Sequence, residues 1–488
     1  MKQTDAGTHT STTADKAAWI GLVTGLLLML ITLLIPAPHG MSPAAWSAVG
    51  LALLMAVWWA TEAIPIPATS LLPIVLIPAL GLGTVKDATS PYADPIIFLF
   101  LGGFLIGLAM QRWNLHRRIA LVTLLAVGSK PSHQIAGFML ATGFISMWVS
   151  NTATTIMMLP IGMSVVAMLD SEDPAEVNRY ATALLLAIAY SASIGGIATL
   201  IGTPPNALLA GYLSNNHRIT LGFAQWMLIG VPVAVLMLTF TWWWLTRKGF
   251  NLTHTDQGNQ RLKAELAKLG PLSRGEKRVA LVFLLAAAAW IFQPLLSQYI
   301  PWLNDTSIAI AAALLLFLIP VELGSRQFVM NWKAAEGIPW GVLLLFGGGL
   351  SLAGVIKSSG LAEWIAQSLN IFSALPILLM IGLVVLVIIY LTEVTSNTAT
   401  AAAFLPLMGA LAISQDVSPL LFTIPAAISA SCAFMMPVAT PPNAIVFATG
   451  HMRIASMIQA GFVLNLFGVV VVTLLSYFLI GLIWSLAA

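Results

Sequence analysis

The chain has 488 residues, of which 59% are hydrophobic and only 8% are charged. Soluble domains carry about 25% charged residues, so this composition excludes a soluble protein of this size. Apolar runs of membrane-spanning length recur, and the short alternating segments of a membrane β-barrel are not seen. The single cysteine, Cys432, excludes an intramolecular disulfide and a cysteine-based metal cage. The net charge of +3 comes mainly from basic loops and indicates no nucleic-acid partner. We therefore predict an all-α polytopic membrane protein.

The apolar runs predict the elements in chain order. A polar tail over residues 1–17 precedes a first transmembrane helix within 18–41, which we interpret as retained because its apolar run is long for a signal peptide. Two apolar pairs, about 134–168 and 374–414, each centre on a Ser-Asn-Thr tripeptide, and each half is short for a full span. We predict that they are re-entrant hairpins with the tripeptides near their tips. Eleven full crossings are predicted at about 18–36, 44–60, 66–82, 94–111, 179–213, 222–246, 278–298, 305–321, 339–356, 419–450 and 458–486.

The distribution of Lys and Arg predicts the orientation. The segment 247–277 is the richest basic loop of the chain and is expected to face the cytoplasm. Counting back six crossings places the N-terminus in the cytoplasm, and eleven crossings in all place the C-terminus outside. We expect the protein to be integral to the plasma (inner) membrane.

Two sets of motifs recur in the same order. "VSNTATTIMMLPIG" is matched by "TSNTATAAAFLPLMG", with the tripeptides 246 residues apart, at Ser150 and Ser396. "SASIGGIATLIGTPPNALL" is matched by "SASCAFMMPVATPPNAIV". Several motifs in one order and at nearly one spacing indicate a duplication. We assign repeat 1 to residues 42–246 and repeat 2 to residues 278–488.

The two copies are predicted to face opposite ways across the membrane. The same offset of 246 residues relates Phe100 to Phe346. Phe100 lies in the fourth predicted crossing and Phe346 in the ninth, five crossings further along, and an odd number of steps reverses the direction of the chain. The sequence therefore predicts an inverted-topology repeat, as in many secondary transporters, whose binding site lies near the midplane at the repeat interface.

Each repeat has two helix interruptions with oxygen-rich surroundings. Ser-Asn-Thr supplies hydroxyl and amide oxygens without charge, and the Pro-Pro of each Thr-Pro-Pro-Asn breaks a helix and frees backbone groups. Freed carbonyls and hydroxyls suit a hard monovalent cation, whereas helix N-termini suit an anion such as a carboxylate. No Lys or Arg lies in either motif, so a buried anion needs another source of positive charge, which bound sodium ions would supply.

Two kinds of polar residue in the apolar stretches fit more than one role. Small polar residues in membrane helices often only pack helices closely, although two matched copies with matching Pro-Pro breaks favour a binding site. Glu62 and Glu393 lie near apolar stretches, and either is a candidate proton site, with a role at a helix end equally compatible with Glu62.

These residues resemble the divalent anion/sodium symporter family from about Ser42 to the C-terminus. The resemblance lies in "TEAIPIPATSLLP", "FLFLGGFLIGLAMQRWNLHRRIA", the two "SNTAT" motifs and "GTPPN" with "ATPPN". It implies a homodimer in which each protomer has a scaffold domain and a transport domain that moves as an elevator. Amphipathic arm helices joining the two domains are expected after Arg112 and Lys357.

The resemblance also implies site residues. A first sodium site would use Ser146, Ser150, Asn151 and the backbone at Gly202, and a second would use Thr392, Ser396, Asn397 and the backbone at Ala439. The dicarboxylate would meet Asn151, Thr152, Thr203, Asn397, Thr398, Thr440 and Pro441. Sodium is thus expected as the co-transported ion.

The predicted function is sodium-coupled symport of C4-dicarboxylates, such as succinate, malate and fumarate, across the lipid bilayer. The alternatives are a sodium-independent dicarboxylate exchanger and a sodium-coupled carrier of tricarboxylates or sulfate. Both halves keep the full oxygen-rich set, which favours the sodium-coupled branch. An ion channel is a further alternative. An enzyme is not expected, because the seven histidines show no catalytic or zinc-binding spacing.

Overall fold

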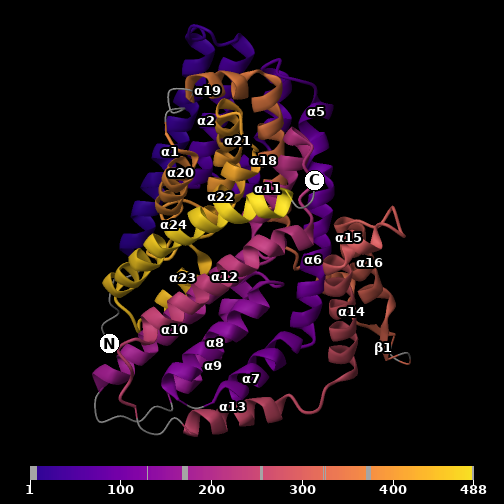
Figure 1. Cartoon of the computed structure of the whole chain (residues 1–488), viewed down its shortest axis with the longest axis vertical. Helices are drawn as coiled ribbons and strands as arrows, with labels where there is room; N and C mark the ends of the chain where they lie inside the picture. Colours follow the sequence, from indigo (N-terminus) through magenta and orange to yellow (C-terminus); the bar gives the residue numbers. More distant parts are fainter. Residues whose placement is uncertain are drawn as a thin grey trace.

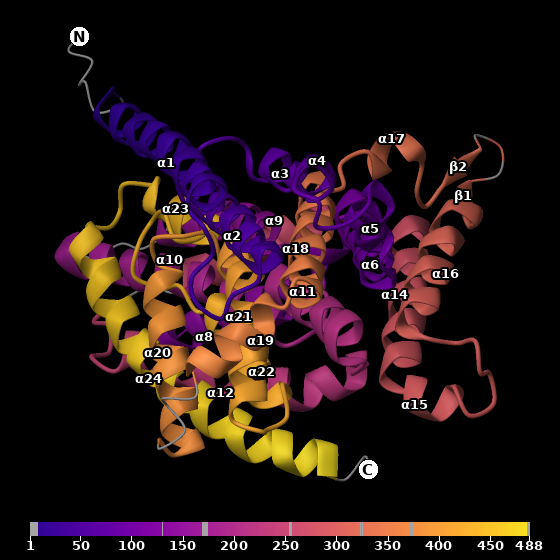
Figure 2. The same cartoon turned by 90° about the horizontal axis from the view of Figure 1, so that it is seen from above.

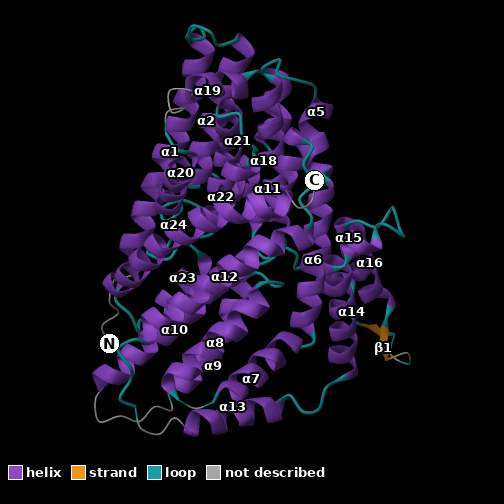
Figure 3. Ribbon diagram, viewed as in Figure 1, coloured by secondary structure: helices purple, strands orange, loops and turns teal. Residues whose placement is uncertain are grey.

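The computed structural model describes residues 8–128, 130–167, 174–252, 256–322, 324, 326–369 and 375–485. Among these residues, the regular secondary structure is almost entirely helical, so the prediction of an all-α fold is confirmed (Figure 3). A small antiparallel hairpin of β1 (Pro320–Glu322) and β2 (Gln327–Phe328) was not expected. The first seven residues of the predicted tail, and positions 168 and 374 at the edges of the predicted hairpins, lie outside the described residues.

The helices divide between the two halves of the sequence. The first half contains α1 (Thr8–Leu34), α2 (Pro43–Thr61), α3 (Ile66–Thr69), α4 (Leu72–Ala79), α5 (Val85–Thr89), the 3₁₀ turn η1 (Ser90–Ala93), α6 (Pro95–Arg112), α7 (Leu115–Val127), α8 (Pro131–Ser146), α9 (Asn151–Val166), α10 (Pro174–Ile197), α11 (Pro204–Tyr212), the π-helical turn η2 (Leu213–His217) and α12 (Phe223–Thr246). The second half contains α13 (Asp256–Lys268), α14 (Arg274–Ile291), α15 (Gln293–Leu296), α16 (Asp305–Leu318), α17 (Trp332–Ala335), α18 (Trp340–Ser358), α19 (Leu361–Leu369), α20 (Ile377–Leu391), α21 (Asn397–Ser414), α22 (Leu420–Ala430), α23 (Pro441–Phe447) and α24 (Ile454–Ser485).

Eight helical segments among the described residues are long and apolar enough to cross a membrane. Seven of them coincide with predicted crossings. The eighth is α21, which the sequence assigned to one half of a re-entrant hairpin, and its 18 residues would suffice for a span. The predicted crossings over 66–82, 278–298, 305–321 and 419–450 contain shorter or interrupted helices.

Two pairs of consecutive helices have the tripeptides at the turns that join them. α8 ends at Ser146 and α9 begins at Asn151, while α20 ends at Leu391 and α21 begins at Asn397. Ser150 caps α9, because its hydroxyl accepts the backbone N–H of Ala153 at 3.3 Å. Figure 1 shows the pair α8–α9 in the lower half of the molecule and the pair α20–α21 in the upper half.

Two further helices are interrupted at the Pro-Pro sequences. α10 stops at Ile197 and the chain resumes as α11 at Pro204, and α22 stops at Ala430 and resumes as α23 at Pro441. The prolines fill the first two positions of the new helices, where a missing N–H costs nothing. α10 is the most buried of the long helices, because it packs on α8, α9, α12 and α23.

The helices α14 and α16 form a separate edge of the molecule together with the β-hairpin (Figure 2). They pack mainly on α6, and α14 also contacts α7 and α12. The contact is close at Gly102, since a methyl group there would lie 2.7 Å from the backbone of Ala309.

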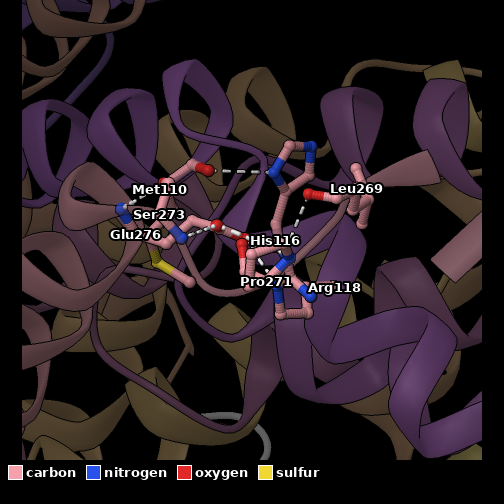
Figure 4. Close-up of polar contacts among 7 residues, drawn as sticks. All are labelled: Met110, His116, Arg118, Leu269, Pro271, Ser273 and Glu276. Atoms are coloured by element: carbon pink, nitrogen blue, oxygen red, sulfur yellow. Dashed lines mark hydrogen bonds and ion pairs between the residues drawn. The ribbon is translucent and has the colours of Figure 1, made fainter. Parts of the chain in front are cut away.

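Helices begin at both positions where arm helices are expected, α7 at Leu115 and α19 at Leu361, again 246 residues apart. α7 also contacts α13, the helix formed within the basic segment 247–277. Arg117 pairs with Glu265 of α13 at 2.7 Å, and Arg118 pairs with Glu276 at the start of α14 at 2.6 Å (Figure 4). The basic segment therefore holds α7 through two ion pairs.

The start of α7 is fixed by a buried histidine. The Nδ1 of His116 lies 3.0 Å from the carbonyl oxygen of Met110, to which it donates, because a carbonyl can only accept (Figure 4). Burial lowers the pKa of His116, which favours the neutral ring.

Candidate functional site

Three oxygen atoms meet at the turn between α8 and α9. The hydroxyl of buried Ser146 lies 2.7 Å from Asn151 Oδ1 and 2.6 Å from the carbonyl oxygen of Ala192, in α10. The backbone of Gly196 and Gly202 closes the other side, since a methyl group on Gly196 would lie 2.8 Å from Asn151 Oδ1 and 2.9 Å from the Gly202 carbonyl oxygen. The structure thus brings together Ser146, Asn151 and Gly202, three of the four residues that the resemblance implies for the first sodium site.

The same arrangement recurs between α20 and α21. The hydroxyl of buried Thr392 lies 2.9 Å from Asn397 Oδ1 and 2.9 Å from the carbonyl oxygen of Ala430, in α22. Ala430 is the repeat equivalent of Ala192 in the "SAS" motifs. In each half, one hydroxyl hydrogen faces two oxygen acceptors. A small cation among the three oxygens would satisfy all of them, because hydroxyl, amide and carbonyl oxygens are the ligands of hard cations.

Two asparagines shape the unwound segments in an equivalent way. Asn206 in α11 donates its amide to the carbonyls of Gly196 at 3.3 Å and Thr199 at 2.8 Å. Asn443 in α23 donates to those of Ala433 at 3.2 Å and Met436 at 3.0 Å. Both Oδ1 atoms are buried without a hydrogen-bond partner among the described residues. Sequence reasoning did not select these asparagines, although both belong to the matched Thr-Pro-Pro-Asn motifs.

The helices that follow the turns and the Pro-Pro breaks pack against helices of the other repeat. α11 contacts α21, and α23 contacts α9. Leu208 of α11 and Ala402 of α21 both lie near Gly349, since a methyl group there would contact both side chains. Further along each helix, a methyl group at Gly409 of α21 would meet the hydroxyl of Tyr212 of α11. Because the later residue of α11 lies beside the later residue of α21, the two helices run parallel. Their N-termini, at Thr203 and Asn397, face the same side.

The predicted residues differ in their exposure. Buried positions are Ser146, Gly202, Thr203, Thr392, Thr398, Ala439 and Thr440, half-buried positions are Asn151, Thr152, Ser396 and Asn397, and exposed positions are Ser150 and Pro441. The innermost atoms are thus the hydroxyls of Ser146 and Thr392. The outer residues leave the helix N-termini open to a solute, and these termini favour negative charge.

The donors that meet at the two turns are oxygen atoms. Among the residues that the structure describes, no group of three or more His, Cys, Asp or Glu side chains is placed to hold a metal ion. The hydroxyl, amide and carbonyl oxygens that meet at each turn are the kind of donor that suits a hard cation such as sodium.

The chain is similar to known transport proteins along most of its length. The sequence profile of the sodium:sulfate symporter transmembrane region matches residues 16–485. The sodium-dependent dicarboxylate transporter SdcS of Staphylococcus saprophyticus is 41% identical over 472 residues, which cover 94% of this chain and 91% of that protein. SdcS of Staphylococcus aureus strain USA300 is also 41% identical, over 477 residues that cover 95% of this chain and 91% of that protein. Among solved structures, the YdaH transporter of Alcanivorax borkumensis matches with a TM-score of 0.56 at 14% identity, over 96% of this chain and 99% of that one.

Proposed function

The chain belongs to the sodium:sulfate symporter family, and on that premise we propose that it imports C4-dicarboxylates, such as succinate, malate and fumarate, by sodium-coupled symport. The observation that carries the proposal is the matched set of three oxygens in each half, around Ser146 and around Thr392. Each set would hold one sodium ion. The name of the SdcS relatives, which covers both sodium and dicarboxylates, supports this choice.

The dicarboxylate would bind at the open side of the two sodium ions. Asn151 and Thr152 begin α9, and Asn397 and Thr398 begin α21, so backbone N–H groups and side-chain donors face one carboxylate from each half. Thr203, Thr440 and Pro441 complete the set at the starts of α11 and α23. The two sodium ions would neutralise the dianion, since no Lys or Arg lies in these motifs.

Sodium would bind first and order the turns, which then accept the dianion. Any sodium ion beyond the two that balance the dianion would gain about 2.3 kcal/mol per 100 mV of membrane potential. We further propose that the helix pairs are re-entrant and belong to a transport domain that moves as an elevator against a scaffold. Arm helices α7 and α19 would join the two domains, in a homodimer of the plasma membrane. The N-terminus would be cytoplasmic and the C-terminus outside.

The test is uptake of radiolabelled succinate into proteoliposomes, with an inward sodium gradient and with potassium in its place. We expect accumulation only with sodium, and competition by malate and fumarate. Asn151→Ala and Asn397→Ala should each reduce the sodium-driven rate. Sodium-independent uptake, together with counterflow in sodium-free vesicles, would instead identify an exchanger. Competition by sulfate but not by dicarboxylates would identify a sulfate carrier.

A further inference from the structure

A buried carboxylate lies behind the turn of the second helix pair. Glu393, beside Thr392, is only 3% exposed. Its two oxygens accept the backbone N–H groups of three successive residues, Phe434, Met435 and Met436, at 2.7 to 3.0 Å. Asn465 on α24 donates its side-chain amide to the same carboxylate at 2.7 Å. Every one of these contacts uses Glu393 as an acceptor, which is the hydrogen-bonding pattern of the ionised form.

The three N–H groups belong to the unwound segment between α22 and α23. This segment runs over 431–440, whereas the equivalent segment of the first half runs only over 198–203. Backbone N–H groups in a protein interior need acceptors. Glu393 supplies them where α22 has ended, so it keeps the longer segment open.

The first half reaches a similar shape by other means. Met147 stands at the position of Glu393. Counted back from the Thr-Pro-Pro-Asn motifs, Gly196 and Gly202 stand where the second half has Ala433 and Ala439, and the amides of Asn206 and Asn443 bind the carbonyls of Gly196 and Ala433 in the same way. The two glycines touch, since a methyl group on Gly202 would lie 2.4 Å from the Gly196 carbonyl oxygen. Alanines cannot approach so closely. The second half therefore needs an anchor other than close backbone packing.

The partner of Glu393 on α24 follows the same asymmetry. α12 and α24 begin 231 residues apart, and in each a glycine, Gly230 or Gly461, lets the helix approach the unwound backbone. At this offset Asn465 corresponds to Ala234. Repeat 2 therefore has both the carboxylate of Glu393 and its amide donor Asn465, whereas repeat 1 has the apolar side chains of Met147 and Ala234 at these positions.

We propose that Glu393 is a positioning residue for the second sodium site and makes the two sodium sites unequal. Its carboxylate holds Phe434–Met436 so that the Ala430 carbonyl and the Ala439 backbone face Thr392 and Asn397. It also places a negative charge beside the second site, which the first half lacks. The second site therefore binds sodium more tightly and fills first. This inference rests on the proposed function, because it assigns an order to sodium ions that the symporter carries.

The first experiment measures the sodium dependence of succinate uptake for Glu393→Gln and Asn465→Ala. Glu393→Gln keeps the shape but removes the charge and turns one acceptor into a donor. We expect its half-saturating sodium concentration to rise about tenfold or more, since hydrogen bonds to charged groups are among the strongest in proteins. Asn465→Ala should raise it less. Maximal uptake at saturating sodium should be largely kept in both variants. The half-saturating sodium concentration of the double variant should be only slightly higher than that of Glu393→Gln.

Glu336→Gln makes the same chemical change at an exposed position and should leave the sodium dependence unchanged. If the wild-type protein takes up succinate without sodium, the proposed function fails. If wild-type uptake requires sodium but Glu393→Gln has the wild-type sodium dependence, only the inference about Glu393 fails.

The second experiment needs no transport, because Cys432 is the single cysteine and lies buried in the unwound segment. Its alkylation by N-ethylmaleimide reports the opening of that segment. In the wild-type protein we expect sodium to slow alkylation, and in Glu393→Gln we expect about tenfold faster alkylation with weakened protection by sodium. Equal rates in the two proteins, with equal protection, would overturn the proposal even where the variant does not transport.

Discussion

Phe100 in α6 and Phe346 in α18 pack edge to face, with ring centroids 5.0 Å apart and planes at 86°. They are equivalent residues of the two repeats, 246 positions apart, and both are fully buried. Equivalent residues can touch each other only near the axis that relates the two repeats. This pair therefore marks the axis inside the protein, and the two helix pairs lie on either side of it.

The first prediction concerns this pair. Phe100→Ala and Phe346→Ala should each lower the free energy of unfolding by about 3 kcal/mol or more, because each leaves a cavity in a packed interior. The double variant should lose about 0.5–1.5 kcal/mol less than the sum, the coupling expected of an aromatic pair. Unfolding in mixed micelles with increasing SDS measures these values. Phe98→Ala is the control, since Phe98 on the same helix is 41% exposed and should matter little. Strict additivity would show that the two rings do not interact.

The second prediction tests whether the hydroxyl at the inner end of each oxygen set binds sodium. Thr392→Val keeps the shape but removes the oxygen that lies between Asn397 and Ala430. The half-saturating sodium concentration for uptake should rise about tenfold, because two oxygens lose their partner. Thr392→Ser should behave almost like the wild-type protein, since the first half uses Ser146 at the equivalent position. Equal effects of valine and serine would point to a packing role for Thr392.

The third prediction concerns the glycine contact of the first half. Gly202→Ala would force a methyl group to 2.4 Å from the Gly196 carbonyl oxygen, so the two backbone segments must separate. Because Asn151 Oδ1 lies against the same backbone, sodium-driven uptake should fall at least about tenfold. Gly354→Ala is the matched control, since no atom beyond its chain neighbours and the adjacent backbone of its own helix lies within 4 Å of the added methyl group. Similar losses in the two variants would indicate a general response to added methyl groups.

The sequence predicted the paired interruptions well because their causes are local. Pro-Pro breaks a helix wherever it stands, and a duplicated Ser-Asn-Thr marks both turns. The unequal length of the two unwound segments depends instead on which side chains meet across the fold. The sequence identifies Glu393 only as a candidate proton site, because no local pattern indicates that it accepts the N–H groups of Phe434–Met436. The helix α13 was likewise hidden in a segment noted only for its charge.

The last prediction concerns the ion pair that joins α7 to the start of α14. Arg118 contacts Glu276 through Nε at 2.6 Å and also donates to the carbonyls of Leu269 and Pro271, while Ser273 donates its N–H to Glu276 (Figure 4). Both partners are largely buried, with side-chain exposures of 13% and 4%. Arg118→Met would leave the Glu276 carboxylate buried without its cation.

The expected cost of Arg118→Met is about 3 kcal/mol of unfolding free energy, as for other buried pairs that lose one partner. The loss of stability is measured as a decrease in the unfolding temperature of the detergent-solubilised protein, with size-exclusion chromatography as the readout of the remaining folded protein. Lys268→Met is the control, because its pair with Glu265 is 65% exposed on the lysine side and should contribute below about 1 kcal/mol. If the domains move as proposed, the loosened arm α7 should also change the maximal rate of uptake while the sodium dependence stays the same. A shift in sodium dependence alone would contradict this role, because α7 contributes no side chain to either oxygen set.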